Sequence, residues 1–457
     1  MSTETRLLSG WGGTAPSAAS VVRPDDSLEV ARAMNDAPRR GVIARGLGRS
    51  YGDSAQNAGG SVVDTGGLSE IDLDVETGIA RVDAGASLDA LMREAIPLGW
   101  FVPVTPGTRF VTAGGALAAD IHGKNHHVDG SFANHVDSFT LVDASSSGGG
   151  EPEARTVSLH TDPDLFWATA GGMGLTGIVT EMTFHLIAIE TAVMLVDTDR
   201  VADLDALMAL MVEGDQRYRY SVAWVDCLAR GAHLGRSVLS RGDHAPREAL
   251  ADSRRSDPLA FDPRIRIPAP PWAPNGLLNK LSIRAFNELW FRKAPRHEVG
   301  ALESITSFFH PLDMIDGWNR LYGSRGFLQY QYVVPDDAHE AVRTTLERLV
   351  EAQCASFLAV LKRFGPGNPG PLSFPIPGWT LGLDIPAGLS GLDALLDDLD
   401  QLVADVGGRV YLAKDSRLRP DLLAKMYPDL DAFAAVRDRV DPHRVLQSDL
   451  ARRLGIC

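Results

Sequence analysis

Three glycine-rich stretches in the N-terminal part of the chain constrain its fold more than any other feature. They read RGLGRSYGD at 45–53, TPGTRFVTAGGALAADIHGKNHH at 105–127 and TAGGMGLTG at 169–177, and each follows an apolar run. Glycine lets backbone N–H groups come close to oxygen anions. One such stretch is as consistent with a tight turn as with a phosphate site. Three together predict loops that line a long diphosphate, which favours a dinucleotide over a mononucleotide.

The first stretch does not match the nicotinamide dinucleotide fingerprint. That fingerprint, G-x-G-x-x-G, places its third glycine so that a helix can pack closely on the preceding strand. Here the glycines are Gly46, Gly48 and Gly52, so the third comes one residue late. The residues that follow, DSAQNAGG, are polar and rich in glycine rather than amphipathic. The pattern therefore argues against a Rossmann domain.

Short β-rich runs alternate with helical patterns over the first 190 residues. Strands are expected at 41–46, 61–66 and 79–85, where β-branched residues are bounded by glycine. Ser87 precedes apolar residues at helical spacing, and Thr161 or Asp162 precedes a second such segment with a proline in its first turn. This alternation predicts an α+β fold.

Two stretches are expected to be irregular. The segment DASSSGGGEPEARTV at 143–157 is predicted to be a flexible hairpin tip between two strands, because serine and glycine bury little surface. The proline-rich segment 254–276 is predicted to be a mobile excursion. A domain boundary is expected near 187–191, and the short elements of about the last 50 residues are expected to return to the first domain.

The composition limits the partners of the protein. The chain has 457 residues, with 44 Lys and Arg against 59 Asp and Glu, and a net charge of −15. Such a surface repels a phosphate backbone, so we do not expect nucleic acid as a partner. The cysteines Cys227, Cys354 and Cys457 are too sparse for a disulfide framework or a clustered zinc motif, which favours a reducing compartment.

The location of the protein is constrained by its apolar runs. The N-terminal residues MSTETRLLSGWGGTAPS contain no apolar core of a signal peptide. No apolar run approaches the roughly 20 residues that cross a bilayer. We expect a cytoplasmic protein, or one bound peripherally at the inner membrane, and the sequence leaves the face of the membrane open.

Longer motifs occur in order along nearly the whole chain. They read ARGLGRSYGDSAQN, GGALAADIHGKNHH, LFWATAGGMGLTGI, GFLQYQYVVP, PLSFPIPGWTLGLDIP and YLAKDSR. In these motifs the chain resembles the decaprenylphosphoryl-β-D-ribose 2′-oxidase family, which lies within the vanillyl-alcohol-oxidase-type flavoproteins. The resemblance implies a two-domain α+β fold of the vanillyl-alcohol-oxidase/PCMH type. It also implies FAD as cofactor and a substrate domain built on an antiparallel sheet flanked by helices.

The same resemblance assigns the cofactor contacts. The residues that it implies are Arg45, Gly46, Leu47, Gly48, Arg49, Ser50, Tyr51, Gly52, Asp53, Asn57, Gly107, Thr112, Ala113, Gly114, Gly115, Ala119, Asp120, Ile121, His122, Gly123, Asn125, Ile178 and Tyr411. Arg49 stands where many members of the superfamily carry the histidine that attaches the flavin covalently. A guanidinium cannot form that bond but can pair with phosphate, so non-covalent FAD is expected.

Three residues are expected to carry the reaction. The resemblance places His122 beside the flavin, and an imidazole suits general-base work near neutral pH. It sets Lys414 against the flavin ring, where an ammonium would stabilise negative charge as hydride arrives. Tyr51 is the third expected catalytic residue. Either His122 or Lys414 could accept the proton, and the sequence leaves this choice open.

The histidines of HGKNHH allow another interpretation. His122 and His126 are four residues apart, as two metal ligands on a helix would be, but Gly123 argues against a firm helix and no carboxylate lies between them. No metal is therefore expected. His126 and His127 are expected to form hydrogen bonds with the backbone of their loop.

The substrate contacts also follow from the resemblance. The residues that it implies are Lys124, Trp224, Tyr322, Gln329, Gln331, Lys362, Thr380, Gly382 and Lys414. Lys124 and Lys362 are candidates for binding substrate hydroxyls or phosphate, although Lys362 is also consistent with a solvated end of a helix or strand. Without the resemblance, Trp224 and Tyr322 would be interpreted as core aromatics.

Two of these positions depart from the family pattern. Mycobacterial members carry a cysteine at the position of Gly382 and an asparagine at that of Thr380. The cysteine is the residue that nitroaromatic suicide inhibitors trap. Because glycine offers no thiolate, we expect such compounds to bind this chain only reversibly, while turnover survives.

The combined interpretation is an FAD-binding domain at 1–190, completed by 408–457, and a substrate-binding domain at 191–407, with the active site at their junction. The resemblance implies oxidation of the C2 hydroxyl of decaprenylphosphoryl-β-D-ribofuranose to the 2-keto intermediate, the first step of epimerisation for cell-wall arabinan. The alternatives are an oxygen-using sugar-alcohol or aldonolactone oxidase and an inactive flavin-binding scaffold. The implied partners are the polyprenyl-phosphate sugar, a short-chain reductase and a membrane surface, with 254–276 flanking an open groove.

Overall fold

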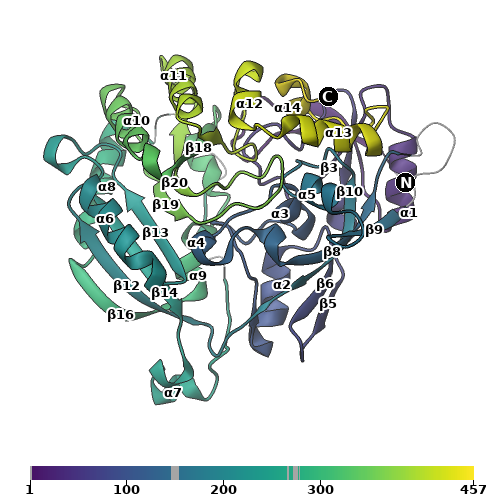
Figure 1. Cartoon of the computed structure of the whole chain (residues 1–457). Helices are drawn as coiled ribbons and strands as arrows, with labels where there is room; N and C mark the ends of the chain where they lie inside the picture. The colour runs from purple at the N-terminus through teal and green to yellow at the C-terminus, as the bar shows by residue number, and fades with distance from the viewer. Residues whose placement is uncertain (1–2, 146–153, 265–266, 271–275, 277) are drawn as a thin grey trace.

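The computed structural model describes residues 3–145, 154–264, 267–270, 276 and 278–457. Its N-terminal half, purple to blue in Figure 1, lies beside a second half formed by the teal and green middle of the chain. The N-terminal half contains a four-stranded and a five-stranded sheet. In spatial order the first is β1 (Glu4–Leu8), β2 (Ser17–Val22), β4 (Ser61–Asp64) and β3 (Val42–Arg45). The second is β5 (Ile71–Asp74), β6 (Ile79–Asp83), β10 (Ile178–His185), β8 (Val136–Val142) and β9 (Ala154–Ser158).

The strands β3, β4 and β6 confirm the three that the sequence predicts. β1 and β2 pair antiparallel, whereas β2, β4 and β3 run parallel. No helix follows β3 directly, because the glycine-rich loop continues as turns as far as β4. The structure thus agrees with the exclusion of a Rossmann domain.

The helices of this half are α1 (Ser27–Asn35), α2 (Leu88–Ala95), α3 (Ala113–Ala118), α4 (His126–Asp129) and α5 (Pro163–Thr169). Two of them begin where the sequence predicts. The Ser87 side chain accepts from the amide of Ala90, and the Asp162 side chain accepts from the amide of Leu165. These side chains satisfy amides that have no partner within the helix.

The second half is built on one eight-stranded sheet in which every neighbouring pair is antiparallel. Its strands in spatial order are β16 (His297–Ser304), β12 (Val193–Val201), β14 (Ser237–His244), β13 (Tyr220–Val225), β19 (Ala359–Phe364), β20 (Gly378–Pro386), β18 (Phe327–Pro335) and β21 (Arg409–Val410). Three helices cover one face of this sheet, namely α6 (Leu204–Gly214), α10 (Glu340–Glu351) and α11 (Leu392–Asp405). The predicted antiparallel sheet flanked by helices is confirmed.

Smaller elements complete the two halves. β7 (Trp100–Phe101) pairs with β11 (Ile187–Ala188), and β15 (Ile267–Pro268) pairs with β17 (Ile315–Asp316). The remaining helices of the second half are α7 (Asp252–Arg255), α8 (Lys280–Lys293) and α9 (Ile305–Phe309). No helix in the described ranges has the length and apolarity to cross a membrane.

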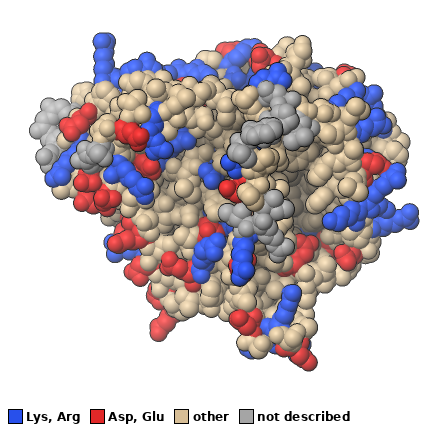
Figure 2. Space-filling model, turned by 180° about the vertical axis from the view of Figure 1, so that it is seen from behind, with Lys and Arg blue, Asp and Glu red and all other residues tan. Residues whose placement is uncertain are grey.

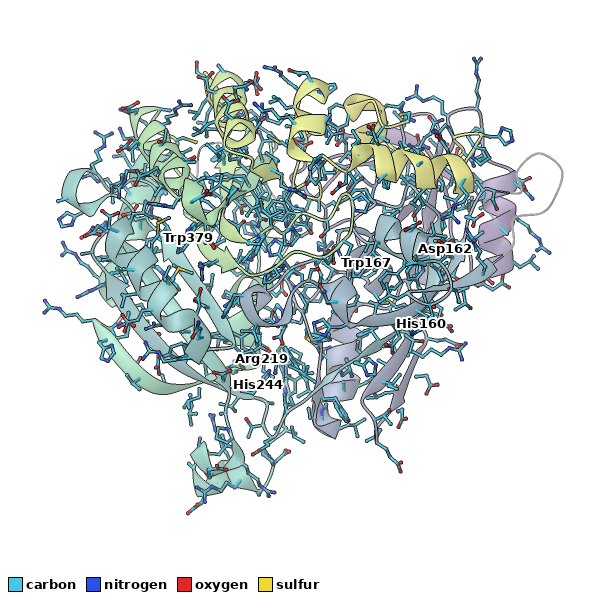
Figure 3. All side chains as sticks on the ribbon, viewed as in Figure 1. His160, Asp162, Trp167, Arg219, His244 and Trp379 are labelled. Carbon is cyan, nitrogen blue, oxygen red and sulfur yellow. The ribbon has the colours of Figure 1, made fainter. Side chains whose placement is uncertain are left out.

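The C-terminal helices lie on the N-terminal half. They are α12 (Pro420–Met426), α13 (Leu430–Val440) and α14 (Asp449–Leu454), drawn yellow above the purple strands in Figure 1. The amide of Val42 donates to the carbonyl of Val445 at 2.8 Å, and Arg439 pairs with Asp162 at 2.6 Å. Figure 3 shows Asp162 below α13 on this side of the molecule. The chain therefore returns to its first half, although β21, which begins the return, still belongs to the eight-stranded sheet.

Of the two segments predicted to be irregular, one has the expected flanking strands and the other is partly anchored to the core. β8 and β9 pair as expected, and the tip between them, at 146–153, lies outside the described residues. The described part of 254–276 does not match the predicted mobile excursion. Arg109 donates to the carbonyl of Pro263 at 2.8 Å, and Leu259 and Phe261 pack against the core of the N-terminal half. Apolar anchors thus hold part of this segment, while 265–266 and 271–275 lie outside the described residues.

The surface charges are mixed in sign. On the face in Figure 2, Lys and Arg side chains are interspersed with Asp and Glu. A surface that binds nucleic acid usually carries an extended patch of positive charge. Among the described residues, the face in Figure 2 shows no such patch.

Candidate active site

The strands β18, β19 and β20 present different residues on their two faces. Tyr330, Tyr332 and Leu383 belong to the core that α6, α10 and α11 cover. Because successive side chains of a strand alternate, Gln331 and Gly382 point to the opposite face. On that face, the N-terminal half contributes the next side chains of the site.

The register of the sheet brings the predicted substrate residues together. Gln329 lies opposite Asp384, and Gln331 lies opposite Gly382. Lys362 lies opposite Thr380 on the neighbouring strand. Residues that are far apart in the sequence thus share one face of three adjacent strands.

Trp224 extends this face along β13. It lies opposite Val360, and its Nε1 donates to the carbonyl of Phe357 at 3.0 Å. Tyr322 is buried and stacks on Phe327 with ring centres 4.1 Å apart. Tyr322 is therefore a core aromatic, and it also adjoins the site, because Phe327 contacts Tyr51.

His122 reaches the sheet face from the second glycine-rich loop. Its Nδ1 lies 2.9 Å from Nζ of Lys362, and its Nε2 lies 3.0 Å from Nε2 of Gln331. Burial, and then the charge of Lys362, hold the pKa of His122 well below its ordinary value. His122 is therefore a neutral imidazole at neutral pH, with one nitrogen to donate and one to accept. The rings packed around it are Phe364, Phe374 and Tyr411.

Three lysines gather at the same place. Burial lowers the pKa of Lys362 to about 7 and that of Lys124 to about 8. The charges of Lys124 and Lys414 contribute to the lowered pKa of Lys362. Burying several cations together is costly unless anions join them. The site therefore suits an anionic ligand, and Lys362 is not the solvated strand end that the sequence also allowed.

Lys124 is held against the second half. Its Nζ donates to the carbonyl of Phe308 and lies 4.1 Å from the centre of the Phe308 ring. A cation on an aromatic face is stabilised without a carboxylate. Lys124 therefore keeps its charge near the site while part of its hydrogen-bonding capacity stays available.

Lys414 and Tyr51 meet at the edge of the sheet. Nζ of Lys414 lies 4.0 Å from the centre of the Tyr51 ring. Burial lowers the pKa of Lys414, and the nearby carboxylate of Asp384 opposes this shift. Burial raises the pKa of Tyr51 well above its ordinary value, so its hydroxyl stays protonated. The structure thus brings together all three predicted catalytic residues with the substrate face.

Asp384 is a site residue that the sequence analysis missed. Its side chain is buried, and its Oδ1 accepts from Nε2 of Gln329 at 2.5 Å. Burial raises the pKa of Asp384, while Lys414 acts to lower it. The alternation of Thr380, Gly382 and Asp384 in TLGLD was the signal that could have identified it, because all three share one face of a strand.

The first glycine-rich loop offers backbone donors. The amides from Gly46 to Ser50 donate to no acceptor among the described residues, whereas the amide of Tyr51 donates to the carbonyl of Ala413 at 3.0 Å. A Cβ on Gly52 would lie 1.9 Å from the carbonyl oxygen of Asp415. The loop is thus packed against the Lys414 segment with five successive amides free, an arrangement that fits the oxygens of a diphosphate.

The second loop is shaped by Thr112 and Asp120. The Thr112 side chain caps α3, and a Cβ on Gly46 would meet Thr112 Oγ1 at 2.2 Å, so the first two loops are in contact. Asp120 has a φ of 38° and a buried carboxylate. The donors to this carboxylate are the side chains of Ser131, Asn368 and Ser373 and the amide of Ala133. Asp120 therefore orients the loop.

Two amides of the third loop contact the second loop. The amides of Gly171 and Met173 donate to the carbonyls of Leu117 and Ala118, at 3.0 and 2.9 Å. These carbonyls lie at the end of α3, where the helix leaves acceptors unsatisfied. The third loop therefore supports the second loop, and these two amides are not available to line a diphosphate.

Several predicted cofactor residues use their side chains for structural contacts. Asp53 pairs with Arg453 at 2.8 Å, and Asn57 accepts from Arg452 at 2.7 Å. Arg45 donates to the carbonyls of Ser9 and Ala55. Only the backbone of Asp53 and Asn57 is left for a ligand, because their side chains hold the C-terminal helix. Their part in cofactor binding remains a prediction.

Other predicted positions have distinct surroundings. The Arg49 guanidinium lies 4.2 Å from the centre of the Trp11 ring and donates to the carbonyl of Leu47. Asn125 donates to the carbonyl of Pro103, and the Tyr411 hydroxyl donates to that of Ala119. Asn125 and Tyr411 are buried, as are the side chains of Ala113, Ile121 and Ile178. The glycines with close neighbours are Gly48, Gly114, Gly115 and Gly123, whereas a Cβ on Gly107 would meet nothing within 4 Å.

The remaining histidines are structural. His127 Nε2 bonds to a backbone carbonyl at 2.9 Å, but this carbonyl belongs to Tyr218 of the second half and not, as the sequence analysis expected, to the loop of His127. His126 differs from the prediction, because its buried Nδ1 lacks a partner and its ring packs on Phe364 with centres 4.4 Å apart. In the part of the chain that the structure describes, no group of three or more His, Cys, Asp and Glu is placed to hold a metal ion.

An ion pair crosses the junction between the halves near the site. Arg219, at the start of β13, pairs with Asp129 of α4 at 2.8 Å. Figure 3 shows Arg219 and His244 side by side at the lower edge of this junction. The contact holds α4, which follows His122 and Lys124 in the chain, against the large sheet.

Comparison with known proteins identifies the domain and the fold. A family model described as an FAD binding domain matches residues 18–147, and one described as D-arabinono-1,4-lactone oxidase matches residues 390–454. The 6-hydroxy-D-nicotine oxidase of Arthrobacter nicotinovorans has the same fold, with a TM-score of 0.62 and 19% identity, over 94% of this chain and 90% of that one. The fold is of the vanillyl-alcohol-oxidase/PCMH type, as expected.

Two curated relatives cover almost the full length. The L-gulono-1,4-lactone dehydrogenase of Mycobacterium tuberculosis is 25% identical over 98% of this chain and 99% of its own. The decaprenylphosphoryl-beta-D-ribose oxidase of Mycolicibacterium smegmatis is 47% identical over 99% of this chain and 98% of its own. The chain therefore belongs to the decaprenylphosphoryl-β-D-ribose oxidase family of FAD-dependent oxidoreductases.

Proposed function

We propose that this protein oxidises the C2 hydroxyl of decaprenylphosphoryl-β-D-ribofuranose to the 2-keto sugar, the first step of epimerisation to the arabinose for cell-wall arabinan. The observation that carries the proposal is the meeting of Lys124, Lys362 and Lys414 with neutral His122 on one sheet face. The 47% identity to a decaprenylphosphoryl-ribose oxidase supports the same substrate class. These half-buried cations suit a sugar phosphate, because they compensate charge that an apolar pocket would exclude.

The substrate is held by side chains of both halves. We assign the phosphate to Lys124 and the sugar hydroxyls to Gln329, Gln331 and Thr380, whose amide and hydroxyl groups can both donate and accept. Trp224 and Tyr322 form the apolar wall of the site. Positioning of this kind contributes to the rate because it orients the C2–H bond before reaction.

The proton of the C2 hydroxyl passes to the pair formed by His122 and Lys362. The lowered pKa of Lys362, about 7, keeps a fraction of its amine neutral near neutral pH. The proton is held between Nδ1 of His122 and Nζ of Lys362, which lie 2.9 Å apart. Lys414 stays charged beside Asp384 and stabilises the negative charge that develops opposite it. When bound, FAD accepts the hydride that leaves C2.

The amides of residues 46–50, which have no acceptor among the described residues, would hold the diphosphate of FAD, and we propose that the cofactor is bound non-covalently. Arg49 cannot form the covalent link, and its guanidinium is stacked on Trp11. Acid precipitation should release all of the flavin into the supernatant. Flavin that stays with the precipitated protein would contradict this assignment.

We assign residues 1–190 and 408–457 to the FAD-binding domain and 191–407 to the substrate-binding domain. Contacts of the C-terminal helices with β3 and α5 support this division. The product is a ketone, so a reductase must complete the epimerisation, and a short-chain reductase is the proposed partner. Because the substrate is a lipid, we propose that the protein works at a membrane surface.

A second candidate is the oxidation of an aldonolactone. It is favoured by the lactone oxidase match at 390–454 and by the 25% identical gulonolactone dehydrogenase. The lower identity makes it the weaker candidate. Fast reoxidation of the reduced flavin by air would favour an oxygen-using oxidase, and an inactive scaffold would show no reduction by either substrate.

Anaerobic absorption spectroscopy tests the proposal. A farnesylphosphoryl-ribose analogue should bleach the yellow flavin within one turnover, whereas L-gulono-1,4-lactone should leave it oxidised. Bleaching by the lactone alone would replace the proposed function with the second candidate. Protein that is purified colourless and cannot be reconstituted with FAD would contradict both.

A further inference from the structure

Helix α8 exposes an unusual amount of apolar surface. Leu281 is 77% exposed, Leu289 68%, Trp290 43% and Phe286 41%. Leu281, Ala285 and Leu289 are spaced four residues apart, so they form one row along the helix. Phe286 and Trp290 form the adjoining row, stacked with ring centres 6.0 Å apart. Together these two rows, here called the α8 face, form a broad exposed apolar stripe.

The charges on α8 are opposite in sign to those of the whole protein. The helix carries Lys280, Arg284, Arg292 and Lys293, and its one acidic residue is Glu288. The carboxylate of Glu288 forms ion pairs with Arg236 and Arg292. Arg284 and Lys293 pair with no carboxylate among the described residues. The helix is therefore a basic element in a chain whose net charge is −15.

Aromatic contacts connect the α8 face to the active site. Phe286 meets Phe357 edge to face at 5.8 Å, and Phe357 stacks with Tyr322 at 5.8 Å. Beyond Tyr322, the ring of Phe327 contacts Tyr51, over which Lys414 lies. An apolar path of side chains thus leads from the exposed helix to the catalytic residues.

We propose that the α8 face docks the protein on an anionic lipid bilayer. Tryptophan and leucine on one side of a helix with lysine and arginine at its borders form the usual pattern of an interfacial helix. The cations of α8 gain further binding energy near an anionic bilayer, whereas a second copy docked through the same basic helix would bring like charges together. The docking rests on the proposed lipid substrate, because it would place the aromatic path at the surface from which a polyprenyl chain enters.

Vesicle flotation of the FAD-loaded full chain tests the docking. The probes are vesicles of phosphatidylcholine alone and vesicles with 30 mol% phosphatidylglycerol, a composition we choose for its negative charge. The protein should float with the anionic vesicles, and L281Q/L289Q should weaken binding at least about tenfold, because two leucines no longer enter the lipid. Reversal of charge in R284E/K293E should weaken it about tenfold as well, and added salt should weaken the wild type.

Matched variants control for nonspecific effects. L7Q/L98Q removes two exposed leucines of the N-terminal half, and R32E/R39E reverses two exposed cations there. Both should float like the wild type. Loss of binding in these controls, or full binding by L281Q/L289Q, would overturn the proposal. A dimer in lipid-free sedimentation that L281Q/L289Q dissociates, with flotation unchanged, would assign the α8 face to a second copy instead.

Kinetics separate this proposal from the proposed function. L281Q/L289Q should turn over a water-soluble farnesylphosphoryl ribose at the wild-type rate, with the KM for vesicle-borne decaprenyl substrate raised about tenfold. Equal KM values for the vesicle-borne substrate would contradict docking through α8 and leave the oxidase activity standing. Absence of turnover with either substrate in the wild type would refute the proposed function, whereas flotation would still report on the α8 face.

Discussion

The glycine-rich loop at 45–53 faces the active site with backbone amides, whereas β18, β19 and β20 face it with side chains. In the loop, the amides from Gly46 to Ser50 donate to no acceptor in the described part of the chain, and the glycines allow close packing against neighbouring segments. On the sheet, the strand register places the functional groups of Gln331, Lys362 and Asp384 on one face. The loop side should therefore be sensitive to added volume, and the sheet side to changed functional groups.

The largest effect, on flavin binding and stability, is expected when a side chain is added to the glycine-rich loop. In Gly52→Ala, the new Cβ would lie 1.9 Å from the carbonyl oxygen of Asp415, so the loop or the Lys414 segment must move. We expect loss of the flavin and a free energy of unfolding lower by about 3 kcal/mol. The ratio of flavin to protein absorbance and thermal unfolding measure these changes.

Gly391→Ala is the control, because it introduces backbone strain without a steric clash. Gly391 has a φ of 77°, and a Cβ there meets nothing within 4 Å. This variant should lose roughly 1 kcal/mol and keep its flavin. If Gly52→Ala binds FAD as the wild type does, the tight packing assigned to the loop side is wrong.

The second largest effect is expected when the cation at the edge of the sheet is removed. Lys414→Met removes the cation over Tyr51, and the rate of anaerobic flavin reduction should fall about 10²- to 10³-fold. Lys414→Arg should keep part of the rate, since it keeps the charge. Lys425→Met serves as control, because Lys425 is exposed and pairs with Asp405 at 2.5 Å. Wild-type reduction by Lys414→Met would remove this lysine from the mechanism.

A smaller effect is expected on the pH profile. The carboxylate of Asp384 raises the pKa of Lys414 against the effect of burial. In Asp384→Asn, Lys414 should therefore lose its proton at lower pH, and the alkaline limb of kcat should move down by about one pH unit. At acidic pH the profiles should converge, because the raised pKa of Asp384 leaves that carboxyl neutral in the wild type too. An unmoved alkaline limb would show that Asp384 does not act through Lys414.

The smallest effect on turnover is expected from Gly382→Cys. A Cβ at this position would contact Gln331 Cγ at 3.4 Å, an ordinary distance, so turnover should stay within about threefold. The new thiol should give a covalent adduct with a nitroaromatic inhibitor that the wild type does not form. Peptide mass spectrometry must place the adduct on residue 382, since Cys457 is exposed in both proteins. An adduct at the active site of the wild type would contradict the reversible binding expected for Gly382.

The local elements followed from the sequence because their causes are local. Ser87 and Asp162 cap their helices, and apolar periodicity predicts the buried face of α2. The proline-rich segment was misjudged because its anchors, Arg109 and the core around Phe261, are distant in sequence. For a similar reason the sequence did not reveal that two amides of the third glycine-rich loop bond to carbonyls of α3, and the part of this loop in holding a diphosphate stays a prediction.

The sequence predicted some residues of the candidate site but not the contacts between them. Family motifs identified His122, Lys414 and the glutamines of β18, although a motif does not show which neighbours they meet. The sequence analysis did not identify Asp384. For Lys362 it allowed both a substrate-binding position and a solvated end of a helix or strand. The alternation within β20 could have placed Asp384 on the face of Thr380 and Gly382, but only the folded chain shows its neighbours and the position of Lys362 beside His122.

By itself the sequence determined the glycine-rich loops, the capped helices, the alternating strands and the family to which the chain belongs. Each of these depends on residues within a few positions of one another or on motifs kept in order. Only the tertiary structure decided that Asp384 neighbours Lys414, that Lys362 contacts His122, and that α8 exposes its apolar rows. The physical reason is that pKa shifts, burial and charge pairing depend on distance in space, which folding sets between residues far apart in the chain.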